Sequence, residues 1–120
     1  MENKDEDRKK IETLLSRDLE SLLISLASPE SAEKVGVRYV PGEELETGIK
    51  IFNKLSGKLR RRICVEWEYC KKRKMPEFSD KIHLIAVIAD IISGIVIGFS
   101  PYTLAVILFM KGLDKYCECK

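Results

Sequence analysis

Apolar residues recur every three or four positions along several stretches of the chain, and this spacing is typical of amphipathic helices. The first stretch, residues 9–27, predicts one helix with a single buried face. It is expected to end before Pro29, because proline disfavours helical backbone at the residue that precedes it. The apolar positions are Ile11, Leu14, Leu15, Leu19, Leu22, Leu23 and Leu26.

A short helical turn and an extended connector are predicted next. Ser28 is a suitable N-cap and Pro29 suits the first helical position, so a new turn is expected to begin there. Residues 35–40 have strand propensity, but no second strand signal can pair with them. We therefore interpret them as an extended connector that ends at Pro41 and Gly42.

The longest periodic segment runs from Leu45 to Cys70 and predicts one apolar stripe over about seven helical turns. Three glutamates within residues 43–46 lie at its N-terminal end, and four basic residues follow its C-terminal end. Both placements complement the helix macrodipole. Gly48 and Gly57 each weaken a helix by roughly 1 kcal/mol relative to alanine, so a kink near Gly57 is expected.

The last third of the chain is apolar, and residues 91–110 contain no formally charged side chain. A run of this length could cross a membrane as one helix. The sequence at 98–101, Gly-Phe-Ser-Pro, interrupts it, because these residues suit the end of one helix and the start of the next. We therefore predict a helical hairpin, with arms at about 80–97, capped by Ser79, and at about 100–116.

One side of the first arm carries small and polar residues and would let a neighbouring backbone approach closely. His83 and Asp90 lie on this side, but seven residues rise about 10 Å along a helix, too far for a direct hydrogen bond. We interpret His83 as a helix N-terminal residue near water and Asp90 as an acid paired across the bundle, in preference to a proton relay. The residues of this side are His83, Ala86, Asp90, Ser93, Gly94 and Gly98.

Together these elements predict an all-α fold, a single compact bundle of four to five helices with an apolar C-terminal helical hairpin. The 120 residues fit one domain, with amphipathic charged helices in 1–78 and the hairpin in 79–120. In size and helix count the chain is similar to small helical adaptor domains, such as death-fold-like modules. That similarity assigns no site residue.

The cysteines and the single histidine limit the metal sites and catalytic groups that the chain can form. The chain begins MENKDEDRKK, without an apolar signal segment, so a cytoplasmic location with free thiols is expected. Cys64 and Cys70, and Cys117 and Cys119, lack the spacing of common zinc sites. His83 is the only histidine, and no P-loop, dinucleotide-binding or serine-hydrolase motif is present. We therefore expect a protein that is not an enzyme and has no cofactor or metal.

The strongest polar feature is a basic stretch within residues 58–74, interrupted by Glu66 and Glu68, in a chain whose net charge is only +2. We expect it to contact an acidic protein surface, or the acidic N-terminal helix of a second copy. The protein is thus predicted to be a small interaction or adaptor protein. The candidate partner-binding residues are Lys58, Arg60, Arg61, Arg62, Lys71, Lys72, Arg73 and Lys74.

Two other partners remain open at this point. The main alternative is a membrane-associated protein with a cytosolic helical head and residues 82–110 in the bilayer, where the basic stretch would meet anionic headgroups. Nucleic acid ranks third, with phosphates held by the basic residues and Trp67 or Tyr69 stacked on bases. It ranks lower because Trp67 falls on the apolar stripe of the long helix and glutamates interrupt the basic stretch.

Overall fold

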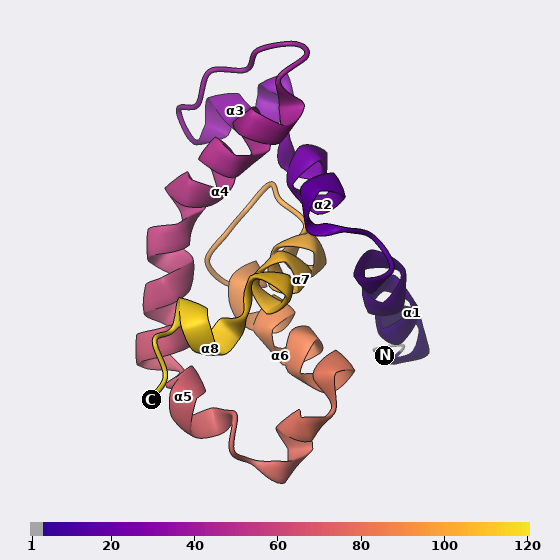
Figure 1. The fold of residues 1–120 in the computed structure, drawn as a ribbon, viewed down its shortest axis with the longest axis vertical. Coiled ribbons are helices and arrows are strands. Elements are labelled where there is room, and N and C mark those ends of the chain that lie inside the picture. The colour runs from indigo at the N-terminus through magenta and orange to yellow at the C-terminus, as the bar shows by residue number, and fades with distance from the viewer. Residues whose placement is uncertain (1–3) are drawn as a thin grey trace.

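Every regular element among the described residues 4–120 of the computed structural model is helical, and no strand occurs there (Figure 1). The all-α class and the C-terminal hairpin are therefore confirmed. More helices are present than the predicted four to five, because three of the predicted helices are broken. The elements are α1 (Lys4–Leu15), α2 (Leu19–Leu26), α3 (Pro29–Lys34), α4 (Glu44–Arg60), the π-helix η1 (Arg61–Glu66), α5 (Tyr69–Lys72), the 3₁₀-helix η2 (Pro76–Ser79), α6 (Lys81–Ser93), α7 (Pro101–Lys111) and α8 (Leu113–Tyr116).

The single helix predicted over residues 9–27 is wrong, because α1 and α2 are separated by a break at 16–18. The Ser16 hydroxyl donates to the Thr13 carbonyl at 2.6 Å, and Asp18 caps α2 by accepting from the Ser21 amide at 2.7 Å. Short polar side chains that bond the local backbone in this way compete with helix continuation. The break lets α1 pack against α6 and α7 while α2 packs mainly against α4.

The predicted helical turn at Ser28 is confirmed, and the connector predicted over residues 35–40 is confirmed for 37–40, since residues 35 and 36 form a turn after α3. Ser28 caps α3 by accepting from the Ser31 amide at 3.0 Å, and Pro29 occupies the first turn. Residues 37–40 form neither helix nor strand, and they lead to a turn at Pro41 and Gly42.

The long helix is irregular at a different place from the one predicted. α4 continues through Gly57 without interruption, so the expected kink there is wrong. The backbone instead widens into the π-helix η1 after Arg60, and it then breaks at Glu68, which has a left-handed φ of 58°. This break starts α5 in a new direction and places Cys64 and Cys70 on separate elements.

The hairpin is formed by α6 and α7, whose termini differ from the prediction by a few residues. Asp80, rather than Ser79, caps α6 by accepting from the Ile82 amide at 3.0 Å. α6 ends at Ser93, so Gly94 and Gly98 lie outside it, in the loop that leads to α7. Ser100 caps α7, as predicted, and Gly112 separates α7 from α8.

α7 lies at the centre of the fold (Figure 1) and contacts α1, α2, α6 and α8. Its residues 104–108 are fully buried. The uncharged run 91–110 is therefore divided between the end of α6, a loop and a core helix. Within residues 4–120, no helix has both the length and the apolar character needed to cross a membrane.

Candidate functional site

The structure separates the eight predicted partner-binding residues into two groups on either side of the break at Glu68. Lys58 and Arg60 to Arg62 lie at the end of α4 and the start of η1, and all are exposed. Lys71 to Lys74 lie on α5 and the turn that follows it, where Lys72 and Arg73 are half-buried. The single basic stretch of the sequence is therefore two surfaces with different surroundings.

The first group borders a depression of about 490 Å³ that is lined by Lys58, Arg61, Arg62, Glu66 and Ile95. Glu66 pairs with both arginines, at 3.0 Å from Arg62 Nη1 and 3.7 Å from Arg61 Nε. One carboxylate does not neutralise three cations, so the depression keeps a net positive charge. Ile95 belongs to the α6–α7 loop, which the sequence did not place near the basic residues.

The same loop carries Ile97, whose side chain is 90% exposed and is the most exposed large apolar side chain in the described part of the chain. The Lys34 side chain from the end of α3 lies against Gly98, the next residue of the loop. Basic side chains thus border the loop on two sides. We define the loop surface as Lys58, Arg61, Arg62, Ile95 and Ile97.

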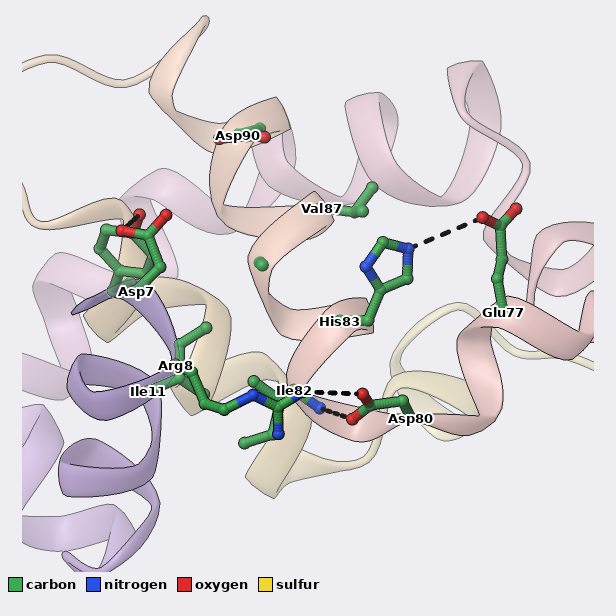
Figure 2. Close-up of a pocket in the computed structure, with 11 residues that line it drawn as sticks. Asp7, Arg8, Ile11, Glu77, Asp80, Ile82, His83, Val87 and Asp90 are labelled. Atoms are coloured by element: carbon green, nitrogen blue, oxygen red, sulfur yellow. Dashed lines mark hydrogen bonds and ion pairs between the residues drawn. The ribbon is translucent and has the colours of Figure 1, made fainter. Parts of the chain in front are cut away.

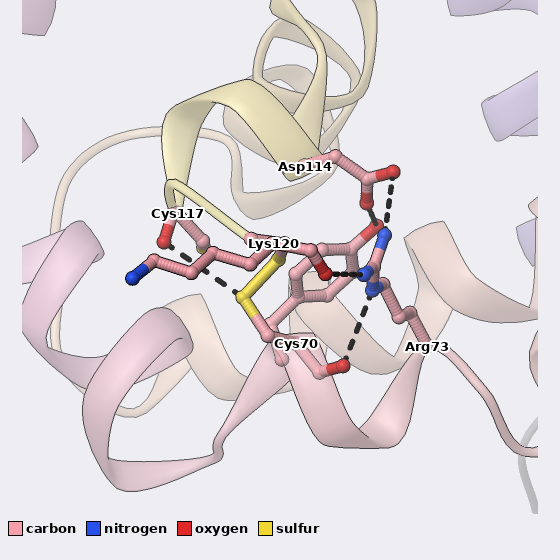
Figure 3. A network of polar contacts seen from close by, with 7 residues as sticks. Cys70, Arg73, Asp114, Cys117 and Lys120 are labelled. Atoms are coloured by element: carbon pink, nitrogen blue, oxygen red, sulfur yellow. Dashed lines mark hydrogen bonds and ion pairs between the residues drawn. A yellow bond between two sulfur atoms is a disulfide. The ribbon is translucent and has the colours of Figure 1, made fainter.

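Arg73, in the second group, holds the C-terminal segment in place (Figure 3). Its guanidinium pairs with Asp114 at 2.9 Å and donates to the carbonyls of Lys120 and Cys70 at 3.1 and 3.2 Å. The Tyr69 hydroxyl donates to the other oxygen of Asp114 at 2.8 Å. Burial, and then the bond to Asp114 and its charge, raise the pKa of Tyr69, which Arg73 partly counteracts.

Arg60 also has a structural contact, because its guanidinium lies 4.8 Å from the centre of the Tyr116 ring. Lys71 pairs with Glu68 at 3.1 Å. Lys58, Lys72 and Lys74 form no ion pair within residues 4–120. The structure thus leaves Lys58, Arg61 and Arg62 as the basic residues that surround a concave surface, whereas Arg60 and Arg73 stabilise the fold.

The expected free thiols are not found, because two disulfides join the C-terminal segment to η1 and α5. Cys64 bonds Cys117 and Cys70 bonds Cys119, with Cα–Cα distances of 5.2 and 5.4 Å that suit a disulfide. Neither spacing in the sequence reveals this pairing, which depends on the return of the C-terminus to η1. Free thiols were expected from a cytoplasmic location, and that location, which was inferred from the N-terminal sequence, stays a prediction.

A second concave region, which the sequence did not reveal, lies between α1, η2 and α6 (Figure 2). This cleft has a volume of about 600 Å³. Four carboxylates line it, from Asp7, Glu77, Asp80 and Asp90, together with the Arg8 and His83 side chains. Apolar side chains complete the lining: Ile11, Ile82, Ala86, Val87 and the ring of Tyr102.

Most polar side chains of the cleft have partners within it. Arg8 donates to Asp80 at 3.1 Å, and the Tyr102 hydroxyl donates to Asp7 at 2.9 Å. The hydrogen bond from the Ile82 amide is the main cause that lowers the pKa of Asp80; desolvation opposes it, and the hydrogen bond from Arg8 lowers the pKa further. These bonds fasten α1 to the start of α6 and to α7, so the cleft is part of the folded framework.

His83 and Asp90 both line this cleft but have different surroundings. His83 is in the first turn of α6 and exposed, as predicted, with Nε2 3.7 Å from Glu77 and its ring stacked on Phe78. Asp90 is exposed and pairs with no basic side chain within residues 4–120, so the predicted pairing across the bundle is wrong. Trp67 is half-buried against the core and packs edge-to-face on Phe78, in agreement with its place on the apolar stripe.

In residues 4–120 no three His, Cys, Asp or Glu side chains are grouped so that they could hold a metal ion. No protein-family model matches the chain, and no curated protein or solved structure matches it significantly. Function is therefore inferred from the geometry of the loop surface and the cleft.

Proposed function

We propose that this protein is a small, non-enzymatic helical interaction protein that binds an acidic protein partner through the loop surface. The observation that carries the proposal is the position of Ile95 in a depression bordered by Lys58, Arg61 and Arg62. The 90% exposure of Ile97 on the same loop adds an apolar contact. Arginine beside exposed apolar side chains is typical of protein interfaces.

Contacts within the fold reduce the number of predicted basic residues that are available for direct contact with a partner. Arg60 and Arg73 bind Tyr116 and the C-terminal segment, so substitutions there would disturb the fold as well as any binding. Lys71, Lys72 and Lys74 lie beyond the break at Glu68, where they can add long-range attraction for an acidic partner. Direct contact is assigned to Lys58, Arg61 and Arg62.

The surroundings of these residues favour protein over nucleic acid or lipid. Glu66 places a carboxylate between Arg61 and Arg62, where a phosphate backbone would be repelled. Trp67 packs on Phe78 and is not free to stack on a base. Anionic lipid headgroups would meet the same carboxylate, whereas a protein partner can place its acidic and polar groups around it.

The absence of catalysis is part of the proposal. All four cysteines are in disulfides, so His83 has no thiol nucleophile to activate. The His83 ring stacks on Phe78 and its Nε2 faces Glu77 at the protein surface. These contacts support a structural role for the histidine.

The test compares two triple charge reversals. Lys58→Glu, Arg61→Glu and Arg62→Glu change the loop surface, whereas Lys9→Glu, Lys54→Glu and Lys115→Glu change exposed lysines that form no ion pair within residues 4–120. The probe is a fluorescently labelled synthetic peptide rich in glutamate and leucine, and binding is followed by anisotropy. We expect the first variant to lose at least about tenfold in affinity and the second to lose much less, since local contacts exceed screened long-range attraction.

Equal losses in the two variants would mean that only net charge matters, and the proposal would fail. Duplex DNA and phosphatidylserine vesicles serve as competing probes. Tighter binding of either than of the peptide would contradict the assignment of a protein partner. Circular dichroism of each variant checks that the helices are retained.

A further inference from the structure

We infer that the acidic partner is a second copy of this chain, whose cleft between α1, η2 and α6 receives the loop surface of the first copy. The inference rests on the proposed function of the loop surface and names its partner. It pairs the loop surface, which carries basic and exposed apolar side chains, with a cleft lined by carboxylates and apolar side chains.

Both surfaces carry apolar side chains that could be buried against each other. Ile97 is 90% exposed on the α6–α7 loop, and burial of an exposed isoleucine on association is favourable. The cleft offers an apolar lining from Ile11, Ile82, Ala86 and Val87. Its volume of about 600 Å³ is far larger than one side chain, so it can accept Ile97 together with its neighbours in the loop.

The charges of the two surfaces are opposite. The cleft contains four carboxylates against Arg8, which is already paired with Asp80 and Glu12. Among the described residues Asp90 has no basic partner, and Lys58 on the loop surface has no acidic partner. A contact between copies would provide both with a partner and would place Arg61 and Arg62 near the remaining carboxylates.

The two surfaces differ from each other, so the contact is head-to-tail. The pair as a whole still has one unused loop surface and one unused cleft, each on a different copy, unless the rotation between copies closes a ring. The size of the assembly should therefore rise with protein concentration. High salt should oppose it, because the contact includes exposed charges.

Sedimentation velocity of the full chain with its disulfides intact tests the inference through two complementary variants. The first carries Lys58→Glu, Arg61→Glu and Ile97→Ser and has an altered loop surface. The second carries Glu77→Lys and Asp90→Lys and has an altered cleft; it leaves untouched Asp7 and Asp80, which fasten α1 to its neighbours. The matched control for the second variant is Glu20→Lys with Glu118→Lys, at exposed positions away from the cleft.

We expect the wild-type chain and the control to associate, and the association constant to fall at least about tenfold when salt rises from about 50 to about 500 mM. Each variant alone should sediment as a monomer. An equimolar mixture should form a dimer that does not grow further, because each variant keeps one intact surface. Circular dichroism of both variants confirms that they remain folded.

A monomeric wild-type chain at all concentrations would overturn the inference. So would variants that associate like the wild type, or a mixture that stays monomeric. If the chain is monomeric but the acidic peptide still binds and depends on Lys58, Arg61 and Arg62, the proposed function stands and only the identity of the partner is wrong. If the chain is monomeric and peptide binding does not depend on these three residues, both the inference and the proposed function are wrong.

Discussion

Gly48 lies directly against the backbone carbonyl of Leu23, at the point where α4 crosses α2. A β-carbon at position 48 would overlap this carbonyl oxygen, and neither atom belongs to a flexible side chain that could move aside. The glycine that weakens α4 as an isolated helix is therefore required for the packing of α4 on α2.

We predict that Gly48→Ala lowers the free energy of unfolding by about 2 kcal/mol, since the two helices must separate. Gly57→Ala is the matched control in the same helix, because a β-carbon there meets no atom within 4 Å. It should raise stability by about 0.5–1 kcal/mol through helix propensity. Urea denaturation followed by circular dichroism measures both, and a stabilising Gly48→Ala would contradict the close crossing.

Removal of one disulfide should destabilise the protein strongly. Cys64 and Cys117 are separated by 53 positions, but Cys70–Cys119 already joins the same two segments, so the additional loop that the first disulfide closes has only about ten residues and stabilises the fold by about 2–3 kcal/mol in the chain-entropy model. The double variant Cys64→Ser with Cys117→Ser should therefore melt at a lower temperature than the wild type. The wild-type melting temperature should also fall after reduction. Mass spectrometry after alkylation without reductant should find no labelled cysteine, and four labelled cysteines would contradict the pairing.

Stability should decrease at alkaline pH because of Tyr69. The pKa of this hydroxyl is raised in the folded protein above its ordinary value of 10.0, chiefly by burial. The unfolded chain therefore loses the proton first, so the contribution of Tyr69 is complete below pH 10.0 and is lost progressively above it. Tyr69→Phe should flatten the alkaline part of the melting profile, whereas Tyr39→Phe, at a half-buried position, should retain it.

Asp80 should make the opposite contribution at acid pH. Its pKa is lowered below the ordinary value of 3.8, mainly by the Ile82 amide. The stabilisation is therefore complete above pH 3.8 and is lost as pH falls below it. Asp80→Asn keeps a side chain that can cap α6 but does not titrate. As pH falls below 3.8, the melting temperature should decrease less in the variant than in the wild type. An equal decrease in both would mean that other carboxylates cause the loss of stability.

The sequence predicts local structure correctly where the hydrogen bonds of a few neighbouring backbone groups decide it. Ser28 with Pro29, and Ser100 with Pro101, begin helices as predicted, because an N-cap acceptor followed by proline satisfies the free amides of a first turn. The break after Leu15 was missed although Ser16 and Asp18 could have indicated it. Apolar periodicity continues across this break and so hides it.

The candidate surfaces could not be predicted in the same way. The loop surface combines residues near 60 with residues near 95, and the cleft combines residues near 8, 80 and 90. Nothing in the spacing of Lys58 and Arg61 indicates that Ile95 lies beside them. The sequence shows the charged residues within 58–74. It does not show which of them are available for a partner and which make contacts that stabilise the fold.

The sequence by itself determined that this protein is all-α, where its C-terminal hairpin turns, and that cationic side chains concentrate within 58–74. These properties follow from periodicity, capping and composition, which act over a few neighbouring residues. The tertiary structure alone decided the close crossing at Gly48, the pairing of Cys64 with Cys117 and of Cys70 with Cys119, and the position of Ile97 at the surface. Each of these depends on contacts between segments far apart in the chain, because packing the apolar faces together sets which distant residues meet.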